Sequence, residues 1–322
     1  MYKSLDETVY FMKILLQFPE GLKQEALKHA KKLELEGNEV FISASPTFGA
    51  CDLAIDEAKN LGAEKLIHFG HAEFHKVDFN VEYISYSYDA PLTLLPKSLE
   101  KLEPYHKIGL MTTIQHIHQL EMVKRFYEEH GKEVIIGKPY GFAKKAGQIL
   151  GCDIGSAASI DKEVEVFVYF GGGLFHPLGA LLHTKKPFLL VEPFNNTIEF
   201  LDRYREIYNK KSRGRILSSL DAKKIGILVS TKNGQHNMNL AKILKNKLEA
   251  NGLSAAILVA NTFDFDSINN MMEFDAFVNT ACPRIAIDDT DRTRKPLLSA
   301  NEIMEVIKLK KERVELQKEH LR

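Results

Sequence analysis

Three cysteines are the residues of this chain best suited to chemistry. Cys51, Cys152 and Cys282 are the only cysteines among 322 residues. Each follows Gly or Ala and precedes Asp or Pro, neighbours that favour turns in which the backbone approaches a ligand closely. An odd and sparse set of cysteines does not form a disulfide framework. Three isolated thiols in three similar loops therefore suggest one shared site that is assembled by folding.

The chemistry open to three such thiols has several forms. A lone cysteine of an intracellular protein is usually a small buried hydrophobic residue. A structural zinc site takes four Cys or His ligands, usually in closely spaced pairs, and this sequence has no such cysteine pairs. Three thiolates suit an iron–sulfur cluster with one iron left open, although clusters usually take four ligands. Local spacing does not decide between these readings.

Composition narrows the class of protein. The chain has 43 basic and 43 acidic residues, so no general attraction to nucleic acid or to an anionic membrane is expected. It has no apolar run of membrane-spanning length, and its first residues do not resemble a signal peptide. We therefore expect a cytoplasmic protein with two or three domains.

The elements that must position the cysteines form a pattern that starts three times. Apolar strands are expected at Met12–Phe18, Lys107–Thr113 and Lys224–Ser230, and each is followed by a helical pattern and further strands. Alternating strands and helices are typical of a parallel sheet covered by helices. The starts lie about a hundred residues apart, which is too long for a solenoid repeat. The pattern predicts an α/β fold of three related small parallel-sheet domains.

Each expected domain carries one cysteine. The boundaries we expect are 1–100 with Cys51, 101–215 with Cys152, and 216–322 with Cys282 and a C-terminal helix. Linkers are expected near 91–104 and 209–221. Ligands of open α/β sheets collect beyond the carboxyl ends of the strands. Three domains placed around a central pseudo-threefold axis would aim one thiol each at a common centre.

Five motifs stand out in order along the chain: Gln17–Leu22, Phe48–Leu53, His68–His71, Gly147–Cys152 and Asn279–Asp289. Together they resemble a known family, the radical S-adenosylmethionine enzymes of diphthamide biosynthesis, or 2-(3-amino-3-carboxypropyl)histidine synthases. The resemblance runs from residue 12 to about residue 305, and Phe48 stands where the family pattern has Tyr. Because one chain holds all three cysteines, it resembles the archaeal homodimeric form rather than a subunit of the eukaryotic heterodimer.

The resemblance implies a specific reaction. Cys51, Cys152 and Cys282 would ligate a 4Fe–4S cluster, with S-adenosylmethionine bound beside it and an electron donor to reduce it. Cleavage would release methylthioadenosine and a 3-amino-3-carboxypropyl radical. That radical would add to imidazole C2 of a histidine in translation elongation factor 2. No catalytic residue beyond the cluster ligands is assigned.

Five further residues are candidates for binding the cofactor. Gly172 and Gly173 follow an expected strand, where their backbone amides could approach a carboxylate or ribose, or they form an unconstrained turn. His71 could contact substrate or shuttle a proton, although a loop histidine often lies at the surface. Gln235 follows the first strand of the third domain and either contacts the cofactor or makes a loop hydrogen bond.

Arg284, beside Cys282, has two possible roles. Its planar guanidinium could pair with the methionyl carboxylate of the cofactor. An ordinary ion pair with Asp288 or Asp289 is the alternative.

Two other functions fit part of this pattern. Quinolinate synthase is another three-domain, three-cysteine cluster enzyme, which acts on small metabolites, but its motifs differ from those above. A non-catalytic iron–sulfur partner protein would not need an open iron. Formation of methylthioadenosine distinguishes the first function from both.

Overall fold

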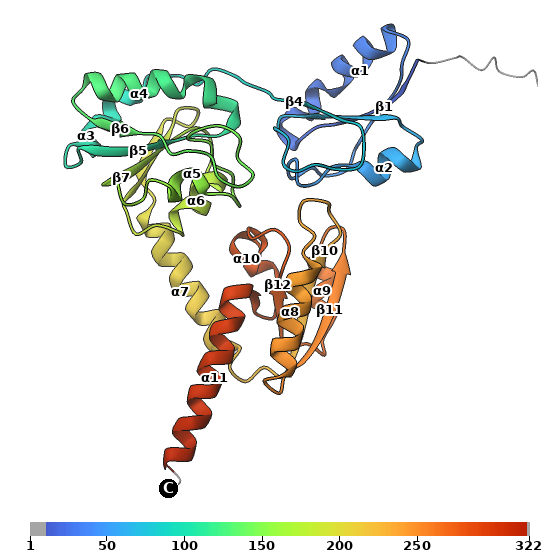
Figure 1. The fold of residues 1–322 in the computed structure, drawn as a ribbon, viewed down its shortest axis with the longest axis vertical. Helices are drawn as coiled ribbons and strands as arrows, with labels where there is room; N and C mark the ends of the chain where they lie inside the picture. Colours follow the sequence, from blue (N-terminus) through green and yellow to red (C-terminus); the bar gives the residue numbers. More distant parts are fainter. Residues whose placement is uncertain (1–10, 321–322) are drawn as a thin grey trace, which may run out of the picture. The chain divides into compact units, whose positions relative to one another are not determined.

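The computed structural model describes residues 11–320 (Figure 1). These residues form two compact units. The first unit takes the chain up to Asp89 together with Ile114–Gln119, and the second takes Ala90–Thr113 and the chain from Leu120 onward.

The first unit is built on one four-stranded parallel sheet. Its strands are β1 (Lys13–Gln17), β2 (Glu39–Ile42), β3 (Lys65–Phe69) and β4 (Val81–Ile84), in the order β2-β1-β3-β4. Its helices are α1 (Ala26–Leu35) and α2 (Ile55–Asn60), with 3-10 turns η1 (Glu20–Glu25) and η2 (Ile114–Gln119). Alternate residues of β1 pack on opposite faces: Ile14 and Leu16 join the cluster under α1, and Leu15 joins the cluster under α2.

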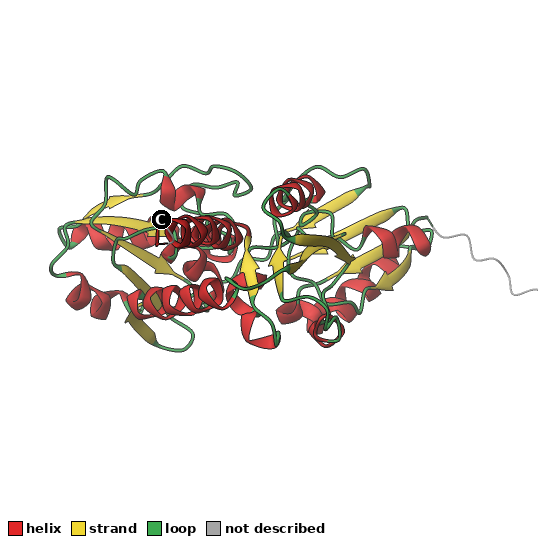
Figure 2. Ribbon diagram, turned by 90° about the horizontal axis from the view of Figure 1, so that it is seen from below, coloured by secondary structure: helices red, strands yellow, loops and turns green. Residues whose placement is uncertain are grey.

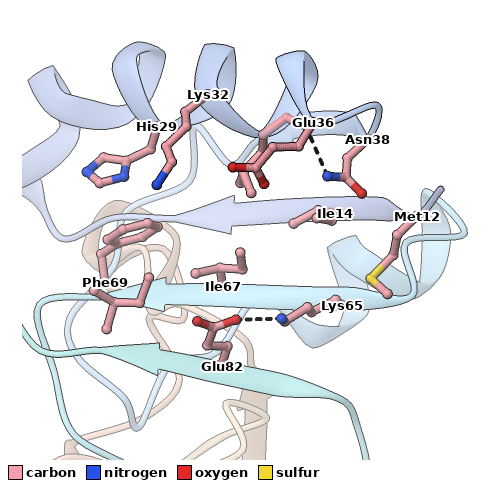
Figure 3. Close-up of a pocket in the computed structure, with 12 residues that line it drawn as sticks. Met12, Ile14, His29, Lys32, Glu36, Asn38, Lys65, Ile67, Phe69 and Glu82 are labelled. Carbon is pink, nitrogen blue, oxygen red and sulfur yellow. Dashed lines mark hydrogen bonds and ion pairs between the residues drawn. The ribbon is translucent and has the colours of Figure 1, made fainter. Parts of the chain in front are cut away.

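A cavity of about 420 Å³ lies between α1 and the sheet of this unit (Figure 3). Its floor is apolar, with Ile14 and Ile67, and its rim carries Lys32 and an ion pair between Lys65 and Glu82. No cysteine lines this cavity.

The second unit contains two sheets. The strands of the first are β5 (Lys107–Met111), β6 (Glu133–Ile135), β7 (Val166–Phe170), β8 (Phe188–Glu192) and β9 (Thr197–Phe200), in the order β6-β5-β7-β8-β9. Its helices are α3 (Leu95–Leu102), α4 (Leu120–Glu129), α5 (Gly155–Ala158) and α6 (Phe175–Leu181). Every residue of β7 and β8 is buried, as expected for strands covered on both faces. Only β9 runs antiparallel among the paired strands of this sheet.

The last sheet is again parallel. Its strands are β10 (Lys224–Ser230), β11 (Ser254–Ala260), β12 (Ala276–Asn279) and β13 (Leu297–Ser299), in the order β11-β10-β12-β13. The helices are α7 (Asp202–Ser218), α8 (Met238–Glu249), α9 (Phe265–Asn269), α10 (Ile285–Asp288) and α11 (Ala300–His320), with the 3-10 turn η3 (Thr290–Arg292). Figure 2 shows helices on either side of the strands. Arg215 of α7 pairs with the buried Glu302 of α11 at 2.5 Å.

The three sheets share one topology. In each, the first strand lies between the second and the third, and the fourth strand follows the third. The expected α/β class with repeated parallel sheets is therefore confirmed. The domain boundaries at 100 and 215 stay predictions.

The segments expected as linkers lie between successive sheets and are largely helical. Leu95, Ser98 and Leu102 bury one side of α3, and the basic segment from 209 to 218 lies within α7. Their role as linkers stays a prediction. The sequence pattern missed β4, β9 and β13, which are short strands at the edges of their sheets.

Candidate functional site

The three cysteines lie in loops at the carboxyl ends of strands. Cys51 lies between β2 and α2, Cys152 between β6 and α5, and Cys282 between β12 and α10. Cys51 and Cys152 thus follow the second strand of their sheets, whereas Cys282 follows the third. Two of the three loops therefore occupy equivalent positions in their sheets. In the other sheets, the loop after the third strand carries His71 or Gly171–Gly173.

The cysteines differ in exposure and belong to different units. Cys152 is exposed, and Cys51 and Cys282 are half-buried. Cys51 lies in the first unit, and the other two lie in the second. Among residues 11–320, no group of three His, Cys, Asp or Glu side chains is arranged to hold a metal ion. Convergence of the three thiols on one cluster stays a prediction.

The Cys51 loop is held by a buried glutamine at the end of β1. The side-chain amino group of Gln17 donates to the carbonyl of Asp52 at 2.7 Å, and its Oε1 accepts from the N–H of Ala54 at 3.2 Å. The N–H of Asp52 donates to the carbonyl of Gly49 at 2.9 Å. These bonds fix the backbone on both sides of the thiol.

Two histidines extend this network toward the thiol. His68 Nδ1 lies 2.9 Å from Gln17 Oε1, and His68 Nε2 lies 3.0 Å from His71 Nδ1. Burial lowers the pKa of His71 to about 4, and burial with repulsion from His71 lowers the pKa of His68 to about 3. Both rings are therefore neutral at pH 7. A Cβ added to Gly49 would lie 3.7 Å from His71 Nε2 and 3.9 Å from Cys51 Sγ, so His71 stands beside the Cys51 loop.

The Cys152 loop is held by the carboxylate that follows the thiol. Asp153 accepts hydrogen bonds from the N–H groups of Ala143 at 2.8 Å and of Gly155 at 2.9 Å, as well as from Phe142. A Cβ added to Gly179 of α6 would lie 2.5 Å from the carbonyl oxygen of Gly151. The loop therefore rests directly on the helix backbone, which only glycine permits.

The glycine run after β7 is partly occupied by the protein itself. Gly173, with φ of +71°, donates its N–H to Glu192 Oε1 at 3.0 Å. The carbonyl of Gly172 accepts from the hydroxyl of Tyr169 at 3.3 Å. The Gly173 amide is thus already hydrogen bonded, and cofactor binding by Gly172 and Gly173 stays a prediction.

The Cys282 loop is held by Asn279, the last residue of β12. Asn279 Oδ1 accepts from the N–H of Ala281 at 3.1 Å, and its Nδ2 donates to the carbonyl of Cys282 at 2.8 Å. The backbone around this third thiol is therefore also tied to the end of a strand.

Arg284 makes the ion pair that the sequence left as an alternative. Its Nε and Nη2 donate to the two carboxylate oxygens of Asp288 at 2.8 and 2.7 Å. Burial raises the pKa of Asp288, an effect that outweighs the opposing attraction of Arg284. Arg284 is 4% exposed, and its Nη1 is buried without a hydrogen-bond partner in the described part of the chain. One donor nitrogen therefore remains for a ligand.

Phe175 connects the two cysteine loops of the second unit. The guanidinium of Arg284 lies 4.6 Å from the centre of the Phe175 ring, within cation–π range. A Cβ added to Gly151 would lie 2.3 Å from the same ring. The neighbours of Cys152 and Cys282 thus pack on one aromatic side chain.

Gln235 lies in the turn after β10, where its N–H donates to the carbonyl of Lys232 at 3.0 Å. A role of its side chain in cofactor binding stays a prediction. Sequence reasoning missed Gln17, His68 and Phe175. Polar residues at the ends of buried strands, such as Gln17 and His68, were the available signal.

The chain is similar to known proteins over most of its length. A family model described as "Putative diphthamide synthesis protein" matches residues 18–317. The 2-(3-amino-3-carboxypropyl)histidine synthase of Pyrococcus horikoshii is 36% identical over 304 residues, which are 93% of this chain and 87% of that protein. Subunit 1 of the human synthase is 29% identical over 300 residues, which are 90% of this chain and 67% of the subunit.

A solved structure is similar over the same span. The crystal structure of Dph2 from Pyrococcus horikoshii with a 4Fe-4S cluster has a TM-score of 0.86 and 33% sequence identity, and the match covers 92% of this chain and 86% of that chain. Within the residues described here, no helix is both long and apolar enough to span a membrane. The chain, with its three strand-end cysteines and three largely parallel sheets, is an enzyme of the diphthamide synthesis family.

Proposed function

We propose that this chain is a 2-(3-amino-3-carboxypropyl)histidine synthase that uses S-adenosylmethionine to modify translation elongation factor 2. The observation that carries the proposal is the 36% identity to an archaeal synthase over 93% of the chain. The structural relative that carries a 4Fe-4S cluster supports the same reaction.

The residues of the three loops suit such a cluster. Cysteine thiolates are the usual ligands of iron–sulfur clusters, and Cys51, Cys152 and Cys282 supply three of them. Each neighbouring backbone is held by a side chain: Gln17, Asp153 and Asn279 respectively. Ligands fixed before binding lose less conformational entropy when a cluster binds. A fourth iron without a protein thiolate would be left for the co-substrate.

When bound, the cluster supplies the electron that splits the bond between the sulfur and the γ-carbon of S-adenosylmethionine, which gives methylthioadenosine and the 3-amino-3-carboxypropyl radical. The chain's task is to bind and orient the reactants. Nη1 of Arg284 is a buried donor, and we assign it to the methionyl carboxylate. Asp288 holds the guanidinium through its other two donor atoms, so Arg284 offers the ligand one nitrogen instead of a bidentate fork.

The proposal includes the partners of this reaction. The protein substrate is elongation factor 2, and radical addition takes place at imidazole C2 of one of its histidines. A homodimer, an external electron donor and a cytoplasmic location belong to the same proposal.

The experiment is an anaerobic incubation of the cluster-reconstituted chain with reductant, S-adenosylmethionine and archaeal elongation factor 2. We expect methylthioadenosine in the small-molecule fraction and one added 3-amino-3-carboxypropyl group on one histidine, found by peptide mass spectrometry. Absence of both products from a chain that holds its cluster would contradict the proposal. It would favour a cluster enzyme of small metabolites or a non-catalytic cluster protein.

A further inference from the structure

The orientation of Gln17 is determined by groups with fixed hydrogen-bonding roles. The carbonyl of Asp52 can only accept, so the atom of Gln17 that lies 2.7 Å from it is the amino nitrogen. The N–H of Ala54 can only donate, so the atom that lies 3.2 Å from it is the amide oxygen. These two backbone groups assign the side-chain amide without reference to any histidine.

This orientation determines the tautomer of His68. Gln17 Oε1 is an acceptor, so His68 Nδ1, at 2.9 Å, carries a proton and donates. A neutral imidazole has one N–H, so His68 Nε2 is a lone-pair acceptor. Burial keeps this ring neutral, as its lowered pKa indicates.

The same reasoning then determines the tautomer of His71. His68 Nε2 lies 3.0 Å from His71 Nδ1, so Nδ1 of His71 carries the proton and donates. Nε2 of neutral His71 is therefore a lone-pair acceptor. It faces the space beside Gly49 in which an added Cβ would lie 3.7 Å from Nε2 and 3.9 Å from Cys51 Sγ.

We propose that Gln17 and His68 hold His71 as an acceptor whose Nε2 lone pair receives a hydrogen bond from an N–H group of a reactant bound beside Cys51. The inference rests on the proposed function for the reactants, and two of them carry such a group: the α-ammonium of S-adenosylmethionine and the imidazole N–H of the target histidine. Gln17 and His68 are positioning residues, because they act through His71.

The tautomers are tested on the full chain without its cluster, with ¹⁵N in the histidine rings, by NMR at pH 7. We expect the proton on Nδ1 in both His68 and His71. Gln17→Leu should give His71 a mixture of tautomers, since the first acceptor of the series is lost. If Gln17→Leu does not fold, His68→Phe removes the second member of the series and should have the same effect.

Thr47→Val is the matched control, because Thr47 meets this series only at the amino group of Gln17, at 3.3 Å, and otherwise donates to the carbonyl of Ser45 at 3.5 Å. The tautomers should stay as in the unsubstituted chain. A proton on Nε2 of His71 in the unsubstituted chain overturns the proposal. An unchanged His71 tautomer in both Gln17→Leu and His68→Phe also overturns it.

The donor is identified by equilibrium binding to the cluster-loaded chain, with S-adenosylhomocysteine and elongation factor 2 as separate probes. His71→Phe should weaken one of them about tenfold, as expected for a hydrogen bond to a buried acceptor, and His71→Gln, which keeps an acceptor oxygen, should recover part of the loss. Weaker binding of S-adenosylhomocysteine identifies the α-ammonium as the hydrogen-bond donor. Weaker binding of elongation factor 2 identifies the imidazole N–H of the target histidine as the donor. If neither dissociation constant changes, the assignment of His71 is wrong.

The tautomer measurement needs no turnover. Its result is therefore independent of whether the chain forms methylthioadenosine.

Discussion

The Cys51 loop and the Cys282 loop lie at the same edge of related parallel sheets but have opposite electrostatic character. Beside Cys51, the amide of Gln17 and two neutral imidazoles form a series that ends in a lone pair, and the buried side chain of Asp52 accepts from the N–H of Phe48 at 3.4 Å. Beside Cys282, a buried guanidinium and a carboxylate form an ion pair that leaves one buried donor nitrogen, Nη1, without a partner in the described part of the chain. The repeated fold thus supplies the same scaffold twice, and a few strand-end residues make one loop an acceptor of hydrogen bonds and the other a donor.

The largest difference in stability between variants of the two loops should appear when the positive charge beside Cys282 is removed. Arg284→Gln leaves the half-buried carboxylate of Asp288 without its partner, which should lower the free energy of unfolding by about 3 kcal/mol, at the low end for a buried pair because Asp288 is partly exposed. His71→Phe should change stability much less, since no charge loses a partner. Urea unfolding of the two variants measures both. Equal losses of stability would contradict the contrast between the ion pair beside Cys282 and the neutral histidines beside Cys51.

A steric change should separate the Cys152 loop from the Cys51 loop. Gly179→Ala places a Cβ 2.5 Å from the Gly151 carbonyl oxygen, and the expected cost is about 2 kcal/mol with displacement of the Cys152 backbone. In Gly49→Ala the Cβ meets no atom closer than 3.7 Å, and the strain comes from the φ of +155°. Thermal unfolding measures the stability that each variant loses. A Gly179→Ala chain more stable than the unsubstituted chain would show that α6 and the Cys152 loop are not in contact.

The neutral histidines predict a pH dependence confined to the first unit. The pKa values of His68 and His71 fall from 6.5 to about 3 and about 4 on folding, so the unfolded chain binds more protons below pH 6.5. Their contribution to stability is complete above pH 6.5 and is lost as the pH falls toward 4, at up to about 1.4 kcal/mol per pH unit for each proton.

Amide hydrogen exchange of β1 and β3 between pH 7 and pH 5, corrected for its intrinsic pH dependence, measures this loss. His68→Gln, which does not titrate, should flatten the profile. An equally steep profile in that variant would contradict the assignment of the effect to His68.

The smallest effect is expected at the glycine run. Gly173→Ala meets no atom within 4 Å, but its φ of +71° is unfavourable for alanine, which should cost about 1 kcal/mol. The hydrogen bond from its N–H to Glu192 stays possible. Thermal unfolding measures this cost. If Gly173→Ala loses more stability than Gly179→Ala, the Gly173 loop depends on more than its backbone conformation.

The sequence predicted the repeated sheets because buried parallel strands such as β7 and β8 are continuous apolar runs, and periodicity detects them. It also predicted that the cysteines lie at strand ends. It did not predict the series from Gln17 to His71, because Gln17 and His68 lie on strands that are neighbours in the sheet but far apart in the chain. Whether Arg284 pairs with Asp288 or a ligand was likewise open, since i,i+4 spacing permits the ion pair but does not show which nitrogen remains.

The central claim is that Cys51, Cys152 and Cys282 act together as the ligands of one cluster. The most direct measurement is Mössbauer and EPR spectroscopy of the anaerobically reconstituted chain and of three variants, Cys51→Ala, Cys152→Ala and Cys282→Ala. We predict one 4Fe–4S cluster per chain in the unsubstituted protein, and a weakened or lost cluster with no methylthioadenosine in each variant, while the fold persists. A variant that keeps the full cluster signal and still forms methylthioadenosine would show that its cysteine is not a ligand and would contradict the account.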